Sequence, residues 1–410
     1  MSAPDDPHHH DRFLDGYRVL DFTQYLAGPT CTRLLTELGA EVIKVELAPF
    51  GDPTRAATPR RNKRAGYHVQ QNRGKRSLCL DLRRPEARQL IIELIPHVDV
   101  VVENYSPGVM ARRGLDFDTL SAINPGLVMA SISGFGQHGS LSHKTSFDLI
   151  AQAVSGMMDV TGEPDGAPMF VGSGIADCTA GVHAFAGIGF ALLRKERTGR
   201  GCHLDISMID SLFHMHESNV HGPSMEPETF VARRGGRHHP TVCPAGAFRS
   251  PQGWIVILCT LNQMPYLWAA MGREDLAEDP RFVHNQARLD NLDSFVALVE
   301  EWMAGFGSDA EVIDVLERHR VPCGPVLNPA DALSHPWFLE RGTVRQVDDP
   351  LIGPLMVPGS PIRYIDEPPP PPLVAAALGE DNRAVARLAG YDDAAIDALE
   401  ADGVLFSKDR

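Results

Sequence analysis

Short apolar runs alternate with amphipathic, helix-like segments through the first half of the chain, and this alternation restricts the fold more than any other feature. The strand-like runs occupy residues 18–22, 41–46, 77–82, 98–104, 127–135 and 202–207. Helical segments separate them, and two of these begin at Pro29 and Pro85, where a first helical turn tolerates proline. Nearly continuous Val, Ile and Leu runs between helices indicate a parallel sheet covered on both faces. The sequence therefore predicts an α/β fold, doubly wound.

The rest of the chain indicates a second domain, as a length of 410 residues also suggests. Residues 221–240 are rich in Gly, Pro and charge and are typical of a linker. Residues 246–260 form a predicted hairpin that turns at "PQG", and helical segments follow to about residue 320. A proline-rich spacer at 367–372 precedes two short helical segments near the C-terminus.

Charge and cysteine content exclude several classes of partner. The net charge of -15 argues against nucleic acid or an anionic membrane as a partner, so any phosphorylated ligand needs a local basic pocket. The seven cysteines are scattered and form no CxxC pair, which favours reduced thiols in a cytoplasmic protein over a structural zinc site. The first residues lack the apolar core of a signal peptide. The apolar run at 180–193 is too short to cross a bilayer and predicts a buried core helix.

Basic residues gather near the expected ends of the strands. Neither usual phosphate-binding motif is present, GxGxxG after the first strand or GxxxxGK[ST] anywhere. Basic side chains at strand ends suit an anionic, phosphate-bearing ligand, although each of them is also explained as solvated surface charge. They are Arg60, Arg61, Lys63, Arg64, Arg73, Lys75, Arg76, Arg83, Arg84, Arg112 and Arg113.

Two carboxylates precede apolar helical runs. Asp177 follows small residues and falls in the first turn of a predicted helix, where the macrodipole and free N–H groups would favour the ionised form. It is either a plain helix cap or a nucleophile that attacks an acyl centre. Asp148 is either an N-cap or a second active-site carboxylate. The histidine pairs His214/His216 and His238/His239 lack a clear third ligand, so we predict no metal site.

Several motifs, in order along the chain, resemble the class III CoA-transferases. These are "LDFTQYLAGPTCTRLLTELGAEVIKVE", "NRGKRSLCLDLR", "VDVVVENYSPGVMARRG", "SFDLIAQAVSGMM", "GIADCTAG", "RKERTGRG", "VPCGPV" and "LGEDN". The family includes formyl-CoA:oxalate CoA-transferase, carnitine CoA-transferase and α-methylacyl-CoA racemase. The resemblance covers residues 18–404 and so extends over nearly the whole chain.

The resemblance implies a fold and an activity. It implies a Rossmann-like large domain at 1–220 that the chain re-enters at 336–410, a smaller α+β domain at 221–335, and an interlocked homodimer. The implied substrates are acyl-CoA thioesters, with succinyl-CoA as a candidate donor, and an organic acid, with no metal and no permanently bound cofactor. Asp177 matches the family's nucleophile, which acts through an aspartyl anhydride and an aspartyl-CoA thioester. Asp148 matches an acidic residue beside it.

The same resemblance carries over a set of CoA-binding residues. It implies that the loop after the first strand lines the CoA site, that a loop after a later strand lies along the CoA, and that an arginine binds phosphate. The positions are Leu26, Ala27, Leu80, Asp81, Leu82, Arg83, Asn104, Tyr105, Ser106 and Arg112.

Departures from the family pattern bear on the substrate. Oxalate-using members carry glutamine where Leu26 stands and arginine where Leu47 stands, and no glycine-rich loop is found at 240–265, so formyl-CoA and oxalate are disfavoured. Racemases carry a His-Asp pair where this chain has Phe147-Asp148, which places racemase second to transferase. A CoA-binding protein without activity is a third possibility, against which the intact Asp177 argues. Arg55 and Arg237 are either clamps for a substrate carboxylate or surface arginines.

Overall fold

The computed structural model describes residues 12–407, so the first eleven residues, with the predicted lack of a signal peptide, lie outside it. The chain divides into two compact units. One contains residues 1–155, 172–215 and 335–410, and the other contains 156–171 and 216–334. The boundaries predicted from the sequence, at 220 and 335, stay predictions. The sequence pattern did not separate residues 156–171 from the large domain, whereas in the structure this segment belongs to the second unit.

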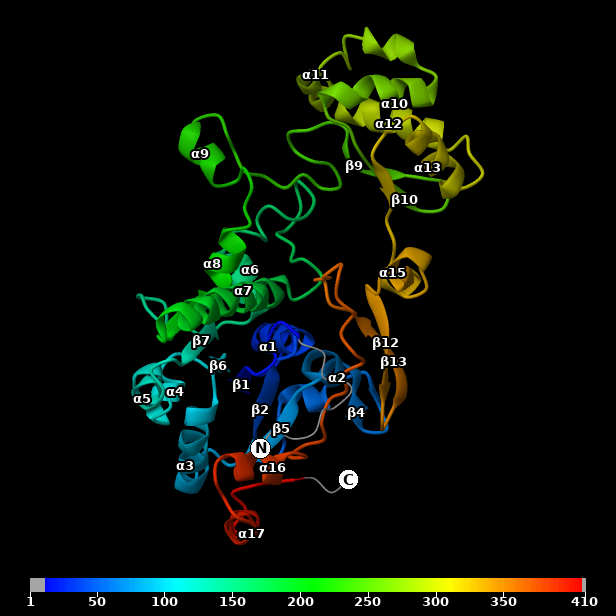
Figure 1. Ribbon diagram of the computed structural model, residues 1–410. Coiled ribbons are helices and arrows are strands. Elements are labelled where there is room, and N and C mark those ends of the chain that lie inside the picture. The colour runs from blue at the N-terminus through cyan, green and yellow to red at the C-terminus, as the bar shows by residue number, and fades with distance from the viewer. Residues whose placement is uncertain (1–11, 408–410) are drawn as a thin grey trace. The chain divides into compact units, whose positions relative to one another are not determined.

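The larger unit is built on a six-stranded parallel sheet (Figure 1). Its spatial order is β5-β2-β1-β6-β7-β8, the order of a Rossmann sheet. The strands are β1 (Arg18–Asp21), β2 (Glu41–Leu47), β5 (Arg76–Leu80), β6 (Val100–Glu103), β7 (Val128–Ser133) and β8 (Cys202–Ser207). The chain winds outward in both directions from the β1–β6 pair, so the topological switch point lies between these two strands. The predicted α/β fold is confirmed.

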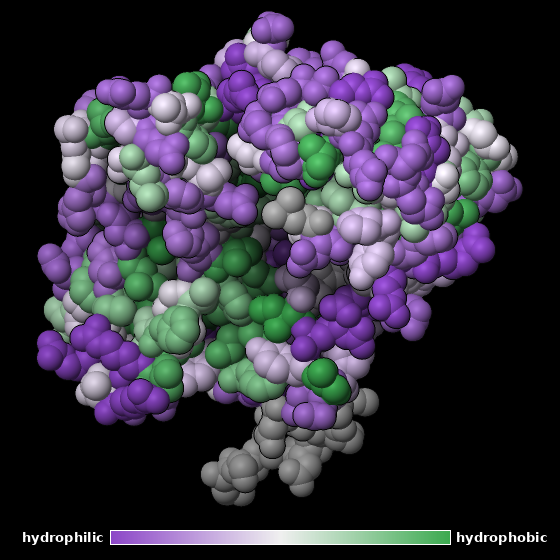
Figure 2. All heavy atoms as spheres, turned by 90° about the horizontal axis from the view of Figure 1, so that it is seen from above, coloured by the Kyte–Doolittle hydropathy of each residue, from purple (hydrophilic) through white to green (hydrophobic). Residues whose placement is uncertain are grey.

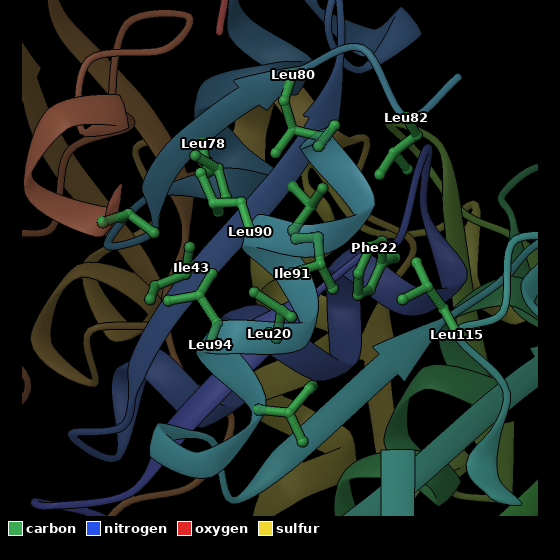
Figure 3. Close-up of a cluster of buried hydrophobic side chains, with 14 of the residues drawn as sticks. Leu20, Phe22, Ile43, Leu78, Leu80, Leu82, Leu90, Ile91, Leu94 and Leu115 are labelled. Atoms are coloured by element: carbon green, nitrogen blue, oxygen red, sulfur yellow. The ribbon is translucent and has the colours of Figure 1, made fainter. Parts of the chain in front are cut away.

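Alternating strand residues feed two hydrophobic cores, one on each face of the sheet. On one face Leu20, Ile43 and Leu78 pack with Leu90 and Ile91 of α3 (Pro85–Leu94), as Figure 3 shows. The same core takes in α4 (Val109–Arg112), α5 (Phe117–Ile123), α16 (Asn382–Leu388) and α17 (Asp393–Ala401). On the other face lie α1 (Ala27–Glu37), α6 (Asp148–Val154), α7 (Ile175–Thr198) and α8 (Met208–Phe213).

Helix α7 is longer than its apolar run indicated. It has 24 residues, which is long and apolar enough to cross a membrane by length and composition alone, so the argument from a short run was wrong. Its core face is nevertheless packed, with Ala176, Ala180, Ala184 and Ile188 fully buried against the sheet and α1. The opposite face, which includes Phe190, stays exposed, and Figure 2 shows hydrophobic residues gathered in patches at the surface.

The remaining elements complete each unit. In the larger unit they are β3 (Arg60–Arg61), β4 (Arg64–Ala65), α2 (Gly66–Asn72), α15 (Pro336–Glu340) and the hairpin of β12 (Val344–Asp349) and β13 (Gly353–Pro358). The smaller unit holds α9 (His221–Met225), α10 (Met264–Met271), α11 (Asn285–Asp290), α12 (Leu292–Met303), α13 (Asp309–Arg318) and α14 (Pro329–Ala332). Its sheet is antiparallel, with β9 (Ala245–Arg249) and β10 (Trp254–Leu258) forming the predicted hairpin and β11 (Cys323–Pro325) beside β10.

Candidate active site

Asp177 lies in the first turn of α7, as the sequence predicted. Burial raises the pKa of its carboxyl group from 3.8 to about 7, and the charge of Asp148 adds to this effect. Burial and the Asp148 charge therefore oppose the ionised form that the helix N-terminus was expected to favour. With a pKa of about 7, the carboxyl group exists both as the neutral acid and as the nucleophilic carboxylate near neutral pH.

Asp148 caps the helix that carries Asp177. Its Oδ1 accepts hydrogen bonds from the backbone N–H groups of Ala176, at 2.7 Å, and Asp177, at 3.3 Å. Its Oδ2 accepts a hydrogen bond from the Gln152 side chain at 2.6 Å. Asp148 is thus a cap, but of α7 and not of its own helix, whose N-cap is Phe147. Because Asp148 satisfies these N–H groups, the Asp177 side chain is not consumed as a cap.

Leu26 joins the start of α1 to the start of α7. It is the N-cap residue of α1, and Ala27 is the first residue of that helix. The Leu26 Cδ2 atom lies 2.6 Å from the position that a Cβ on Gly174, the N-cap of α7, would occupy. Further along, a Cβ on Gly181 would lie 2.4 Å from the Ala27 carbonyl oxygen. Glycines on α7 therefore let two helix N-termini meet beside Asp177.

Asn104 closes the switch point between β1 and β6. Its Nδ2 donates to the Gln24 carbonyl oxygen at 2.8 Å, and its Oδ1 accepts from the Gln24 N–H at 2.8 Å. The next residue, Tyr25, has a φ of +63°, a left-handed conformation that needs support from its surroundings. The Asn104 amide thus fixes the loop that presents Leu26, and ligands of doubly wound sheets bind at this place.

A buried network of charges lies beneath the same loop. Asp21 accepts hydrogen bonds from the N–H and hydroxyl of Thr23 and pairs with Lys75 Nζ at 3.0 Å. Lys44 donates to the Thr23 carbonyl oxygen at 2.7 Å and pairs with Asp52. Every backbone polar group of Thr23 is therefore held, and the loop starts from a rigid base.

Tyr105, Ser106 and Arg112 follow β6, near Asn104. The Tyr105 N–H donates to Glu103 Oε2 at 2.8 Å, and its hydroxyl oxygen is buried without a hydrogen-bond partner among residues 12–407. Ser106 and Arg112 are exposed. No ion pair engages Arg112 within the described residues, and its guanidinium lies over Gly108, so it is free to meet an anion.

Leu80 and Arg83 lie apart from the switch point. They end and follow β5, the edge strand, which β2 separates from β1. Leu80 is fully buried in the hydrophobic core, with Leu82 close to it. Arg83 is 81% exposed and pairs with Asp81 at 2.8 Å. Both are thus at the ligand end of the sheet, but the structure does not bring them to Asp177.

Several predicted basic ligands have structural partners instead. Besides Lys75, Arg64 pairs with Asp349, Arg73 with Glu37, and Arg76 with Glu41 and Asp381. The two candidate carboxylate clamps are also engaged. Arg55 binds Glu46 at 2.6 Å, and Arg237 binds Glu300 at 2.6 Å and lies over Trp254. Both guanidinium groups thus pair with an acid of this chain, and a role as substrate clamps stays a prediction.

Sequence reasoning missed Tyr67, which lies on α2. The ring is partly buried, and burial raises the pKa of its hydroxyl to about 12, with the charge of Asp177 contributing. Tyr67 therefore lies close enough to Asp177 for the charge of that carboxylate to raise the pKa of the tyrosine hydroxyl. The segment 66–72 has little apolar periodicity, so no helix was expected there and its aromatic residue drew no attention.

Comparisons with known proteins agree with the motif-based resemblance. The sequence model of a family described as CoA-transferase family III matches residues 14–382. The chain is 38% identical over 352 residues to the acetyl-CoA:oxalate CoA-transferase of Acetobacter aceti, covering 85% of this chain and 88% of that one. It is 39% identical over 364 residues to the succinyl-CoA:mesaconate CoA-transferase of Haloarcula marismortui, covering 86% and 90%.

A solved structure supports the same relationship. A CaiB/BaiF family protein from Brucella suis superposes with a TM-score of 0.81 at 33% identity, covering 92% of this chain and all of that one. One relative has oxalate in its name, so the preference against oxalate drawn from Leu26 and Leu47 stays a prediction. The resemblance inferred from the motifs is confirmed: the chain belongs to CoA-transferase family III.

Proposed function

We propose that Asp177 is the nucleophile with which this CoA-transferase moves CoA from an acyl-CoA to a carboxylic acid. The observation that carries the proposal is a partly buried carboxyl group beside two helix N-termini that meet at Leu26 and Gly174. The positive ends of helices stabilise the oxyanion that forms when a carboxylate attacks a thioester carbonyl. Helix α1 has no side-chain cap, which leaves its first N–H groups for this purpose.

The reaction proceeds as four acyl exchanges. The Asp177 carboxylate attacks the donor thioester, giving a mixed anhydride and CoA thiolate. The thiolate attacks the aspartyl carbonyl, forming an aspartyl-CoA thioester and releasing the donor acid. The acceptor carboxylate then displaces the thiolate to form a second anhydride. Finally the thiolate attacks the acceptor acyl carbon, which yields the new acyl-CoA and restores Asp177.

We propose that the residues around the topological switch point between β1 and β6 bind CoA. We assign the loop at Leu26 and Ala27 and the loop at Asn104, Tyr105 and Ser106 to the nucleotide and pantetheine, and Arg112 to a phosphate. Succinyl-CoA is the proposed donor and a small organic acid the acceptor, as in the name of the Haloarcula marismortui relative. We assign Leu80 and Arg83 to the edge of the CoA-binding site, away from Asp177.

The experiment incubates purified protein with a panel of acyl-CoA donors and free acids and follows new CoA esters by mass spectrometry. Asp177→Asn is tested in parallel, with Asp293→Asn, a first-turn aspartate of α12, as the matched control. We expect CoA transfer by the wild type and the control, none by Asp177→Asn, and a CoA adduct on the peptide that contains Asp177. Transfer by Asp177→Asn would refute the assignment. Exchange of an α-proton without any acceptor acid would indicate a racemase.

We also propose that the enzyme is an interlocked homodimer in the cytoplasm, without membrane or nucleic-acid partners. The exposed apolar residues of α7, such as Val182, Phe190 and Leu193, support an interface, because soluble monomers rarely leave such faces uncovered. Light scattering on purified protein should give twice the mass of one chain, and a monomer would refute the proposal.

A further inference from the structure

Glu103, the last residue of β6, is a buried acid that no lysine or arginine neutralises within residues 12–407. Its exposed fraction is 3%. Asp21 and Glu46, which are buried at the same end of the sheet, pair with Lys75 and Arg55. Burial, with the charge of a nearby aspartate, raises the pKa of Glu103 to about 7. An unpaired acid in such a place is costly, so its contacts call for an explanation.

Those contacts connect the proposed CoA-binding loop, residues 104–106, to the exposed residue His203 on β8. Glu103 Oε2 accepts the Tyr105 N–H at 2.8 Å, which fixes the turn directly after Asn104. The Ser131 hydroxyl, opposite Glu103 on the neighbouring strand β7, hydrogen-bonds the carboxyl group. Ser131 Oγ also lies 2.9 Å from His203 Nε2 on β8. Ser131 is buried, whereas His203 is an exposed residue whose Nε2 turns inward.

We propose that Glu103 is a positioning residue for the loop 104–106, and that Ser131 and His203 form its proton path to the surface. The proposal rests on the proposed function, in which this loop lies along CoA. When Glu103 is ionised, the Tyr105 N–H donates to a charged acceptor, which gives a stronger hydrogen bond than a neutral one. When Glu103 is protonated, the loop is held less firmly and CoA binds more weakly.

The proton balance of the path is simple. On ionisation, the Glu103 proton passes to the Ser131 oxygen, the Ser131 proton passes to His203 Nε2, and His203 releases its Nδ1 proton to water. In the ionised state Nε2–H donates to Ser131, and Ser131 donates to the carboxylate. In the protonated state both hydrogen bonds run in the opposite direction. The histidine changes tautomer and stays neutral throughout, which suits its pKa, lowered by burial.

The charged groups around the path add no cation that would hold Glu103 ionised. Asp205 on β8 raises the pKa of Glu103 and also faces His203. His138 and Asp118 act on His203 with opposite signs. Glu103 is therefore the member of this line that changes charge near neutral pH.

The test measures the affinity of the full-length enzyme for free CoA by calorimetry between pH 6 and pH 8. We expect the affinity of the wild type, relative to Glu103→Gln, to fall about fivefold on acidification, since a charge-assisted hydrogen bond is replaced by a neutral one. Protonation of the CoA phosphates is common to all variants and cancels in this comparison. Glu103→Gln should bind weakly at every pH without the step.

Ser131→Ala gives the sharper readout. The serine hydroxyl lowers the pKa of Glu103, so its removal should move the midpoint of the affinity change to higher pH. Ser121→Ala, which changes a half-buried serine on α5, is the matched control and should keep the wild-type curve. A simple loss of structure would weaken binding at every pH without moving the midpoint.

The outcomes separate two failures. A wild-type curve that parallels Glu103→Gln, or a Ser131→Ala midpoint that stays in place or falls, overturns the positioning role and leaves the proposed function intact. Absence of CoA binding by the wild type at every pH overturns both. Where Glu103→Gln fails to fold, the Ser131→Ala midpoint decides the question alone.

Discussion

Replacing Asp177 by asparagine should abolish transfer and stabilise the fold above pH 7. The folded state raises the pKa of this carboxyl group from 3.8 to about 7, so it binds the proton more tightly than the unfolded chain does. Between these values the unfolded chain gives up its proton first, and stability falls as the pH rises. A difference of about 3 pKa units corresponds to a ceiling of about 4 kcal/mol. Because Asp177 is only partly buried, solvent screening reduces this to about 2 kcal/mol.

The assay is denaturant unfolding of the wild type and Asp177→Asn at pH 8 and pH 4. At pH 4 the Asp177 carboxyl group is protonated in the folded state, so the stability difference should be small, while at pH 8 the variant should be the more stable. Asp393→Asn, in the exposed first turn of α17, should give no such gain. An equal difference at both pH values, or a less stable variant at pH 8, would refute the reasoning that burial of a charge is the cause.

Three further perturbations follow from the site. Asp148→Asn removes the second charge but keeps an acceptor for the Ala176 N–H, so the midpoint of the kcat–pH profile should move to lower pH; an unmoved midpoint contradicts this. Asn104→Ala frees Gln24 and should raise KM for acyl-CoA about tenfold, measured by initial rates, and an unchanged KM would count against the clamp. Lys75→Met leaves Asp21 buried without its partner and should cost about 3–5 kcal/mol in denaturant unfolding, whereas a loss below about 1 kcal/mol would show that Lys44 suffices.

The inner strands of the large unit were predictable because they are buried on both faces and are continuous apolar runs, as in β6 and β7. The edge strand β8, in which half-buried and exposed residues alternate, was also predicted at its observed bounds of 202–207. The position of Asp177 was predictable for a similar reason, since small residues before a long apolar run mark a helix start. The local sequence pattern was sufficient to predict strands and helix starts, because these depend on neighbouring residues.

The properties of the site depend on distant segments, and these were not predictable. The cap of α7 comes from Asp148, 28 residues before Ala176, and it changes both the role and the pKa expected for Asp177. Lys75 meets Asp21 across 54 residues, and Arg64 meets Asp349 across 285. From the sequence alone, a basic residue near a strand end resembles a ligand contact, because the acidic residue that pairs with it in the fold is distant in the sequence.

The C-terminal helices bear on how the protein is made. Val385 and Ile396 belong to the same core as Leu20 and Leu78, and Leu405 forms a bridge with Leu80. A chain emerging from the ribosome therefore leaves part of one face of its main sheet uncovered until Leu405 has been synthesised. During that interval the sheet depends on other means of avoiding aggregation, such as chaperones or delayed folding. Loss of even the last two helices, by a late stop codon, should therefore leave an insoluble product and not a shortened enzyme.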